Sequence, residues 1–523
     1  TCKKARIVVP NHLVEQWRNE YLKLYPSARI LTTTKDDIDK KHRERFISKA
    51  AMGDWNAIII SQSAFAKINI SKERQQEKIE EQIRQVEETI EYQINNFASH
   101  ASIKGLERSK KIQEAALKKL LDDKGKDNVL TFEKLGVDYL FVDEADAYKN
   151  LFMFTKINNV AGISKAASAR ASDMQLKTEY ITELRGGDKG IVFATGTPIS
   201  NSMAEMYIMQ TYLQKRTLEK LGITFFDNWA ADFGETVTAL ELSPSGQGYR
   251  TRTRFSKFTN LPELLKLYRT FADVQTSDMV KLDVPEAERR TITIKPTETI
   301  QMLTEEIALR AERIYAGGVD PHEDNMLKVT GDGKRLALDA RTFDPNLPDE
   351  RPNKLSVCAG YVYAEWKNSR EIKGTQLVFC DLSTPKKAYE DYEYGKDFDA
   401  YNDLKYKLVE YGIPEKEIAY IHEANTDKQK QDLFNAINAG TVRVLIGSTE
   451  KCGAGTNVQE RLVAIHHLDA PYRPRDLIQR DGRGIRQGNR NKIIRIYTYA
   501  EERTFDSYSY QILETKQRFI SQV

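Results

Sequence analysis

The residues best suited to chemistry in this sequence are acids that directly follow a run of apolar residues. Residues 137–142 read as a buried strand, and Asp143, Glu144 and Asp146 come directly after it. A carboxylate pair at the carboxyl end of a buried strand suits magnesium–nucleotide chemistry, in which Asp143 holds the metal through water and Glu144 polarises the attacking water. Acids commonly end strands, so the pair alone supports a structural and a functional interpretation equally.

Two arginines form the second candidate group. Residues 479–488 read Gln-Arg-Asp-Gly-Arg-Gly-Ile-Arg-Gln-Gly, so Arg483 and Arg486 stand three positions apart. On a helix or a tight turn they share a face and can reach one phosphate group together. An arginine supplied from outside the nucleotide's own lobe stabilises transition-state charge, and Gln479 is suited to orient it. The alternative is a solvated basic helix, which the flanking glycines disfavour because they weaken a helix.

Hydroxyls and small residues follow two further apolar strands. Thr195 and Thr197 come directly after residues 190–194, and Gly455 and Thr456 lie in the block after residues 442–446. Glycine in such a loop lets backbone amides approach phosphate closely. Taken singly, the first block is better explained as an ordinary turn, and the second is a weak signal.

These groups require a scaffold of parallel strands. Short apolar strands alternate with helices in two parts of the chain, which predicts an α/β protein with two lobes, each built on a parallel sheet covered on both faces. Ligands then bind at the carboxyl ends of the strands and in the cleft between the lobes. We expect lobe one at residues 1–296, with mostly helix after residue 201. A connector rich in Gly, Pro and Asp follows at 297–354, and lobe two at 355–523.

Residues 71–126 differ in character from the rest of lobe one. They are rich in Glu, Lys, Gln and Arg, and their apolar residues recur at helical spacings. This pattern predicts a helical hairpin inserted in lobe one, with its turn near residues 98–104.

Composition narrows the class of protein. The chain has 523 residues, 40% of them hydrophobic and 30% charged, with a net charge of only +3. Charge is unevenly distributed, because residues 461–503 hold ten Lys and Arg against five Asp and Glu. This local excess favours a surface that faces phosphate, with a solvated face as the alternative. The four cysteines are scattered, which argues against a disulfide framework or a zinc site. Without a long apolar run or a signal peptide, the sequence predicts a cytoplasmic protein that does not span a membrane.

The order of these blocks resembles the motif order of superfamily-two helicases. The resembling blocks are residues 7–17 (the strand–helix block after the phosphate loop), Asp143–Asp146 (the acidic box), Thr195–Pro198 (the coupling motif), 447–457 (the fifth block) and 479–487 (the arginine-finger block). Residues 194–201, 282–285 and 468–474 are similar to Swi/Snf-type translocases in particular. The chain also resembles the large helicase-like proteins of phages and conjugative elements, which are often fused to DNA methyltransferase domains.

The resemblance implies two RecA-like lobes and an ATP-driven translocase or helicase that acts on nucleic acid, with double-stranded DNA as the expected track. ATP and Mg²⁺ are the implied cofactors, with Asp143 and Glu144 on one side of the nucleotide and the arginine pair closing from lobe two. Thr195 and Thr197 would couple hydrolysis to movement. The positions expected to contact the track, where backbone amides and helix N-termini can meet phosphates, are Pro10, Asn11, Gly455 and Thr456.

Two alternatives stay open. One is an RNA helicase, which Asp146 favours because the Swi/Snf-type branch usually has His at that place. The other is a degenerate helicase fold that serves only as a binding scaffold. The joint presence of Asp143, Glu144, Arg483 and Arg486 argues against a scaffold, which needs none of them together.

The sequence contains no glycine-rich turn that ends in Gly-Lys-Ser or Gly-Lys-Thr, the form that a phosphate loop takes. Gly-Lys occurs only at residues 125–126, 333–334 and 395–396, each time followed by Asp or Arg. In the family this loop precedes the block at Ile7, so we expect it upstream of Thr1, in a longer natural protein. We also expect strands of lobe one that would border the loop's own strand to be exposed.

Overall fold

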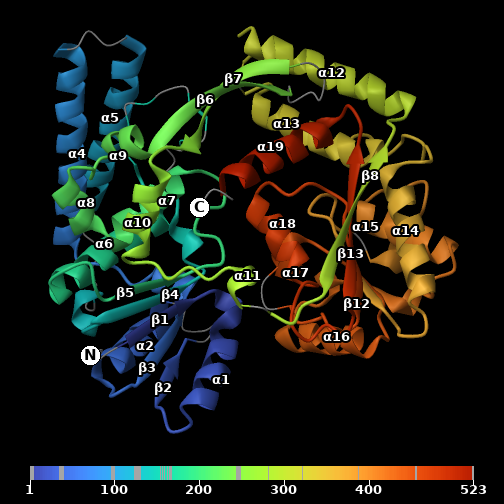
Figure 1. The fold of residues 1–523 in the computed structure, drawn as a ribbon, viewed down its shortest axis with the longest axis horizontal. Helices are drawn as coiled ribbons and strands as arrows, with labels where there is room; N and C mark the ends of the chain where they lie inside the picture. Colours follow the sequence, from blue (N-terminus) through green and yellow to red (C-terminus); the bar gives the residue numbers. More distant parts are fainter. Residues whose placement is uncertain are drawn as a thin grey trace. The chain divides into compact units, whose positions relative to one another are not determined.

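The computed structural model describes most of the chain. The described residues are 5–33, 40–95, 100–122, 131–153, 155, 157, 160–161, 163, 168–242, 249–280, 282–317, 319–320, 322–386, 388–453 and 456–520. The chain divides into two compact units. Unit one comprises Thr1–Val237, Thr253–Asp273 and Phe519–Val523, and unit two comprises Thr238–Arg252 and Val274–Arg518. Each unit is built on its own parallel sheet (Figure 1), which confirms the predicted α/β fold class.

The sheet of unit one has five strands in the order β2-β3-β1-β4-β5, and every neighbouring pair is parallel. In that order the strands are Ile30–Thr32, Ala57–Ser61, Ala5–Val9, Tyr139–Asp143 and Ile191–Ala194. The inner strands β1 and β3 are almost wholly buried, because apolar residues occupy both of their faces. This is the continuous apolar pattern expected of a parallel strand covered on two sides.

Successive residues of these strands pack against different layers. Ile7 and Val9 join a buried cluster with α1 (Val14–Leu24). Val8 joins the main core on the opposite face, which includes α2 (Lys40–Met52), α6 (Ala169–Arg185) and α7 (Ala204–Leu213). Short helices complete this unit: α3 (Gln62–Phe65), α8 (Lys215–Leu221), α9 (Phe226–Phe233) and α10 (Leu261–Arg269).

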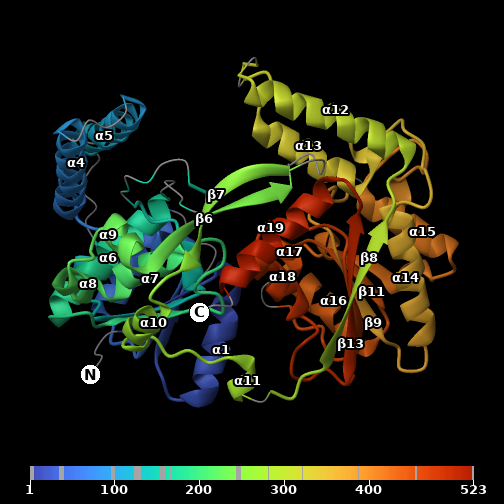
Figure 2. The same ribbon diagram turned by 45° about the horizontal axis from the view of Figure 1, so that its top comes forward.

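The predicted helical hairpin is present as α4 (Lys72–Asn95) and α5 (His100–Asp122), which lie side by side in Figure 1 and Figure 2. Val86 and Leu106 are buried between the two helices, and Lys110 pairs with Glu87 at 2.8 Å. At the base of the hairpin, Lys78 pairs with Glu179 of α6 at 3.1 Å. The turn was expected near residues 98–104, but α5 already begins at His100, so residues 100–104 are helical; residues 96–99 lie outside the described part of the chain.

The expectation of mostly helix after residue 201 was incomplete. Strands β6 (Gly234–Leu242) and β7 (Tyr249–Phe258) form a two-stranded sheet there. The missed signal is the alternation of Arg with Thr and Phe in residues 250–255, since a period of two is typical of a strand with one face against the protein. Phe255 is indeed buried while its neighbour Arg254 is partly exposed.

The sheet of unit two has six parallel strands in the order β10-β11-β9-β12-β13-β8. In that order the strands are Ile418–Tyr420, Val444–Gly447, Thr375–Phe379, Leu462–His467, Ile493–Glu501 and Glu286–Ile294. Strand β11 lies where the apolar residues 442–446 predict a strand. Strand β8, in contrast, falls in the part of the chain that was assigned to lobe one, but it pairs with β13 along its whole length. A boundary at residue 296 therefore does not match the structure, in which unit two resumes at Val274.

Two helical layers cover the second sheet. Alternate strand residues such as Val378 and Ile446 pack with α14 (Lys354–Asn368) and α15 (Ala400–Glu410). Their neighbours Leu377 and Leu445 pack with α16 (Asp427–Ala439) and α17 (Thr449–Gly453). The remaining helices of this part are α11 (Ser277–Val280), α18 (Pro474–Asp481) and α19 (Phe505–Ile520).

The expected loop-rich connector is largely helical. Helices α12 (Glu298–Tyr315) and α13 (Met326–Leu338) pack on each other through a small apolar cluster that includes Ile307 and Leu336. The Gly-Asp-Gly sequence inside α13 resembles a turn, but Gly333 has a packing role. A Cβ atom at Gly333 would lie 2.9 Å from the ring of Phe505, so only glycine permits this contact.

Candidate active site

The candidate residues of unit one lie at one edge of its sheet, because parallel strands all end on the same side. Asp143 is the last residue of β4 and pairs in register with Ala194, directly before Thr195. On the other side of β4, β1 ends at Val9 and is followed by Pro10 and Asn11. Three strand ends thus bring together side chains that are far apart in the sequence.

The acidic block has a defined backbone and defined hydrogen bonds. Trp17 Nε1 donates to Asp143 Oδ2 at 2.9 Å, and Gln62 Nε2 donates to the Asp143 carbonyl at 3.1 Å. The Glu144 amide donates to Asp143 Oδ1 at 3.0 Å. Glu144 itself has a left-handed backbone (φ 50°), which turns the chain directly into the short 3-10 helix Ala145–Tyr148. The side chains of Asp143 and Glu144 remain partly exposed, as carboxylates that meet a ligand must be.

Neither Trp17 nor Gln62 was singled out from the sequence. Trp17 lies in the block of residues 7–17 that resembled the family, so a signal for it existed. Its contact to Asp143 spans 126 positions and depends on the packing of α1 beside β4. Gln62 had no such signal, because no motif was predicted at the carboxyl end of β3, which it follows.

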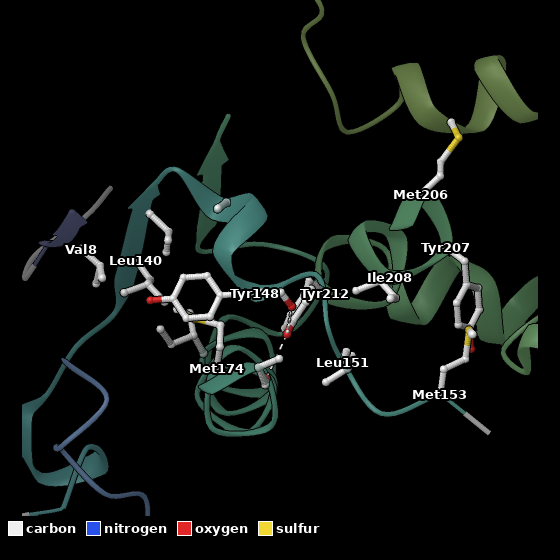
Figure 3. Close-up of a cluster of buried hydrophobic side chains, with 14 of the residues drawn as sticks. Val8, Leu140, Tyr148, Leu151, Met153, Met174, Met206, Tyr207, Ile208 and Tyr212 are labelled. Atoms are coloured by element: carbon white, nitrogen blue, oxygen red, sulfur yellow. Dashed lines mark hydrogen bonds between the residues drawn. The ribbon is translucent and has the colours of Figure 1, made fainter. Parts of the chain in front are cut away.

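A buried cluster fixes the segment that follows the acidic block. Tyr148 is 1% exposed and lies among Leu140, Met174 and Tyr212 in Figure 3. The Tyr212 hydroxyl lies 3.0 Å from the Tyr148 carbonyl and 2.9 Å from the Ala171 carbonyl, so it ties the 3-10 helix to α6. Because the helix starts at Ala145, this anchoring also fixes the direction in which the preceding acids leave the sheet.

A buried ion pair links the acidic block to the segment after β5. Lys149 caps the 3-10 helix and pairs with Glu205 Oε1 at 3.1 Å, with both side chains buried. Glu205 Oε2 accepts hydrogen bonds from the amides of Ser200 at 2.7 Å and Asn201 at 3.2 Å. Upstream, Thr195 Oγ1 accepts from the Thr197 amide at 3.1 Å. The buried pair therefore links the segment after the acidic block to the segment after Thr195–Pro198.

The predicted track-contacting residues of unit one lie at the same edge. Pro10 precedes the 3-10 helix Asn11–Leu13, and α1 begins at Val14, so Asn11 is the first residue of the 3-10 helix and does not cap α1. Its side chain has a different role, since Asn11 Oδ1 accepts from the amide of Ser63 at 3.2 Å. Asn11 is exposed and so is accessible to a ligand.

The arginine pair of unit two has the shared orientation that its spacing predicts. The Nη1 atoms of Arg483 and Arg486 both lie 3.5 Å from the Thr456 carbonyl. Gly484 stands between them, and a Cβ atom there would lie 2.0 Å from Ile494 Cδ1, so this turn rests directly on the sheet. Gln479 lies beside a different arginine: with the amide oriented so that its oxygen faces Arg475, that oxygen accepts from Arg475 Nε and Nη2 at 2.9 Å each. Gly455 lies outside the described residues.

A buried carboxyl group marks the end of β13. Glu501 is 1% exposed, and neither of its carboxylate oxygens has a hydrogen-bond partner among the described residues. The nearby ammonium of Lys354 pairs with Asp506, which also accepts from the Glu501 amide at 3.0 Å. Burial raises the pKa of Glu501 from 4.5 to about 8, although the Lys354 charge opposes this shift. The folded protein therefore binds a proton here that the unfolded chain releases.

This proton predicts a pH-dependent stability. Since the folded pKa is raised, the contribution of Glu501 is fully present below pH 4.5 and is lost as the pH rises to about 8. Glu501→Gln is neutral at every pH and lacks this loss. Its free energy of unfolding, relative to that of the wild type, should therefore rise by roughly 3 kcal/mol between pH 5 and pH 8.5. Urea unfolding of both chains at the two pH values measures this difference. Glu502→Gln, at the exposed neighbouring position, should show no such gain; equal pH profiles for wild type and Glu501→Gln would contradict the prediction.

Other kinds of site are less prominent in the described part of the chain. No group of three or more His, Cys, Asp or Glu residues is arranged there to hold a metal ion. Cys358, Cys380 and Cys452 are buried thiols. Of the helices described, none combines the length and the apolar character that crossing a bilayer requires.

Two family models match the chain. The family described as "Probable helicase domain" matches residues 2–276, more than half of the chain, and "Helicase conserved C-terminal domain" matches residues 387–488. The chain therefore belongs to the probable helicase domain family; this match covers the parallel sheet of unit one, and the match to the helicase conserved C-terminal domain lies within unit two. Members of this class use nucleoside triphosphates, which fits the acids and arginines at the sheet edges.

Individual relatives are distant. Over 525 aligned residues the chain is 22% identical to "Defense against restriction protein B" of Escherichia phage P1. The alignment covers 75% of this chain but only 23% of the phage protein, so the chain spans about a quarter of the length of that relative.

Solved structures with a similar chain include the following two. One is the Sulfolobus solfataricus SWI2/SNF2 ATPase core in complex with dsDNA, with a TM-score of 0.31 and 13% identity, over 96% of this chain and 77% of that one. The other is a variant of S. cerevisiae Dbp5 bound to RNA and ADP BeF3, with a TM-score of 0.41 and 10% identity, over 100% of this chain and 76% of that one.

Proposed function

We propose that the chain is the motor part of an ATP-dependent translocase that acts on double-stranded DNA. The observation that carries the proposal is the edge of the first sheet. There Asp143 and Glu144 leave β4 as partly exposed acids, Trp17 and Gln62 fix them, and Thr195 follows on the next strand. Two adjacent, partly exposed carboxylates at the end of a buried strand are what ATP hydrolysis requires.

Asp143 suits a magnesium ion held through water. Both of its carboxylate oxygens already accept hydrogen bonds from the protein, one from Trp17 and one from the Glu144 amide, so a water molecule between carboxylate and metal fits better than direct coordination. When bound, Mg²⁺ supplies positive charge to the ATP phosphates. Glu144, one residue further along a sharply turned backbone, accepts the proton of the attacking water and orients it.

Arg483 and Arg486 neutralise the charge that develops on the transferred phosphoryl group. Their guanidinium groups reach the same carbonyl, so they can address one phosphate together. Gln479 orients this region through Arg475. Both arginines follow α18 on a turn that rests against the second sheet, which limits their motion.

Thr195 and Thr197 couple hydrolysis to movement. The support for this role is the buried Lys149–Glu205 pair, which connects the acidic block to the amides of Ser200 and Asn201, five to six residues beyond Thr195. A shift of the acidic block on loss of the γ-phosphate would therefore displace this segment. The buried Lys149–Glu205 pair would transmit this shift directly, because the two side chains are held together.

The nucleic acid meets backbone amides and small polar groups at both sheets. The residues that we assign to this contact are Pro10 and Asn11, which follow β1 directly, and Gly455 and Thr456, which belong to the sequence block after β11. Backbone amides at such positions bind phosphate without reading base sequence, which suits a motor that moves along its track.

The phosphate loop comes from a segment of the same protein outside these 523 residues. The support lies in β5, whose pairing partner among the described residues is β4 alone. Val192 of this apolar edge strand is 41% exposed, whereas the strands β1 and β3 are almost wholly buried. An exposed apolar edge invites a further strand, and a strand that pairs there would place a following loop beside Asp143 and Thr195.

One experiment separates this function from its alternatives. In the protein that carries the phosphate loop, steady-state ATP hydrolysis is measured with duplex DNA, single-stranded DNA and RNA at equal nucleotide concentration and one salt concentration. We expect duplex DNA to stimulate most. Stimulation by RNA above DNA would instead favour an RNA helicase, the reading that Asp146 supports by residue type, although that side chain is only 2% exposed. Binding of nucleic acid without hydrolysis would identify a scaffold.

A further inference from the structure

One arginine beside the pair has no role in the scheme above. Arg480 lies on α18, three residues before Arg483, and its side chain is 0% exposed. A buried guanidinium costs free energy unless acceptors surround it. The acceptors of Arg480 come from the ends of three neighbouring strands of the second sheet.

The contacts use every part of the guanidinium. Nε donates to Thr449 Oγ1 at 2.7 Å, and Nη1 donates to the Asp469 carbonyl at 2.9 Å. Nη2 donates to Asp381 Oδ2 at 2.8 Å and to Asp469 Oδ1 at 2.9 Å. Asp381 follows β9, Thr449 follows β11 and Asp469 follows β12, so one side chain ties α18 to three strand ends.

The acceptors are also bound to one another. Asp381 Oδ1 accepts from the Thr449 amide at 2.6 Å, and Asp381 Oδ2 accepts from the Thr449 hydroxyl at 2.8 Å. Asp469 Oδ2 accepts from the amides of Asp381 at 2.5 Å and Leu382 at 3.0 Å. A lysine at position 480 would keep the charge but could not supply the planar, forked set of donors that this arrangement requires.

Arg480, Thr449, Asp381 and Asp469 together form a clamp. This clamp joins the two blocks of unit two that the proposed function uses. Thr449 is the first residue of α17, in the block that continues to Thr456. The carbonyl of Thr456 is in turn the atom that both Arg483 and Arg486 contact. Arg480 therefore holds this block at Thr449, and the arginine pair contacts the same block at Thr456.

We propose that Arg480 is a positioning residue that sets the placement of Arg483 and Arg486 relative to the loop after β11, so that nucleic acid bound at this loop accelerates ATP hydrolysis through the clamp. This inference rests on the proposed function of the arginine pair. The side chain of Arg480 is buried and its three nitrogens already donate to acceptors of unit two, so it is not placed to bind nucleotide or track directly. Its contribution should therefore appear in the maximal rate of stimulated hydrolysis and not in the affinity for either ligand.

The test uses the protein that carries the phosphate loop, with variants at both ends of the clamp. Arg480→Lys should lower the DNA-stimulated kcat by about tenfold to a hundredfold, because small misplacements of catalytic groups have effects of this size. KM for ATP and Kd for DNA should stay within about twofold of wild type. Thr449→Val should have a similar effect, and Thr449→Ser, which keeps the hydroxyl, should recover most of the rate.

The double variant Arg480→Lys/Thr449→Val should be no slower than the slower single variant, because both changes break the same clamp. Arg490→Lys is the matched control, since Arg490 forms an exposed pair with Glu460 and should leave the rate unchanged. If buried Arg480 tolerates no replacement, the partly exposed Thr449 decides the question alone.

Two results would overturn the inference. One is a near-normal kcat in Arg480→Lys or Thr449→Val while Arg483→Ala has lost its rate; the proposed function would then stand without the clamp. The other is losses from Arg480→Lys and Thr449→Val that multiply in the double variant, which would show two independent effects. A normal rate in Arg483→Ala would instead remove the proposed role of the arginine pair itself.

Discussion

Replacing Glu144 by Gln in the protein that carries the phosphate loop should reduce the kcat for ATP hydrolysis by about 100- to 10,000-fold, the range that loss of a general base produces. The amide keeps the size and the hydrogen-bonding capacity of the side chain but cannot accept the proton of the attacking water. ATP binding should persist, because Asp143 and the phosphate loop remain. Steady-state hydrolysis assays measure kcat, and titration with a fluorescent ATP analogue measures the affinity for nucleotide separately.

A matched control for this variant is Glu91→Gln, an exposed position on α4 of the helical hairpin. It changes the net charge by the same amount and should leave hydrolysis unchanged. If Glu144→Gln folds normally and hydrolyses ATP at a rate close to wild type, Glu144 does not activate the water. Asp146 would not be a substitute, because it is buried in the 3-10 helix that follows.

Arg483→Ala and Arg486→Ala should each lower kcat by about 1,000-fold or more, since an arginine that stabilises the transferred phosphoryl group contributes at least that much in related reactions. Their contacts to the Thr456 carbonyl, at 3.5 Å, lie at the outer limit of hydrogen bonding and contribute little to the fold. Affinity for DNA, and its dependence on salt, should change little, because the arginines act on ATP and not on the track.

The salt dependence makes this second prediction decisive. A side chain that binds a DNA phosphate contributes about one unit to the slope of log Kd against log salt, whereas a side chain that acts on ATP contributes none. A reduced slope in Arg483→Ala, together with normal hydrolysis per bound complex, would reassign Arg483 to the DNA backbone. The same measurement on Arg490→Ala, at an exposed surface pair, gives the background for removal of one basic residue.

The parts of the fold that could be predicted from the sequence are those with local signals. Short apolar runs mark strands β1, β3 and β11. The helical spacing of apolar residues marks the hairpin of α4 and α5. The assignment of β8 failed for a different reason. Its residues are mostly exposed or partly buried, as suits an edge strand, and nothing local shows that its partner is β13, some 200 positions later.

The candidate site divides in the same way. Asp143, Thr195 and Arg483 could be found because each follows a recognisable strand or helix at a fixed spacing, and parallel strands necessarily end together. The residues that hold them could not. The Trp17 contact to Asp143 and the Arg480 contacts to Asp381 and Asp469 join positions about 100 apart or pass between separate loops, so only the folded chain shows them.

The central claim is that this chain is a motor whose phosphate loop comes from another segment of the same protein. Steady-state ATP hydrolysis tests it most directly. The rate is measured with Mg²⁺ and saturating duplex DNA, once for these 523 residues and once for the protein that carries the phosphate loop. The 523 residues alone should show no turnover above the Glu144→Gln background, because no Gly-Lys-Ser or Gly-Lys-Thr is present to hold the β- and γ-phosphates. The protein with the loop should hydrolyse ATP and respond to DNA. Robust DNA-stimulated turnover by the 523 residues alone would contradict this account, as would its absence from both proteins.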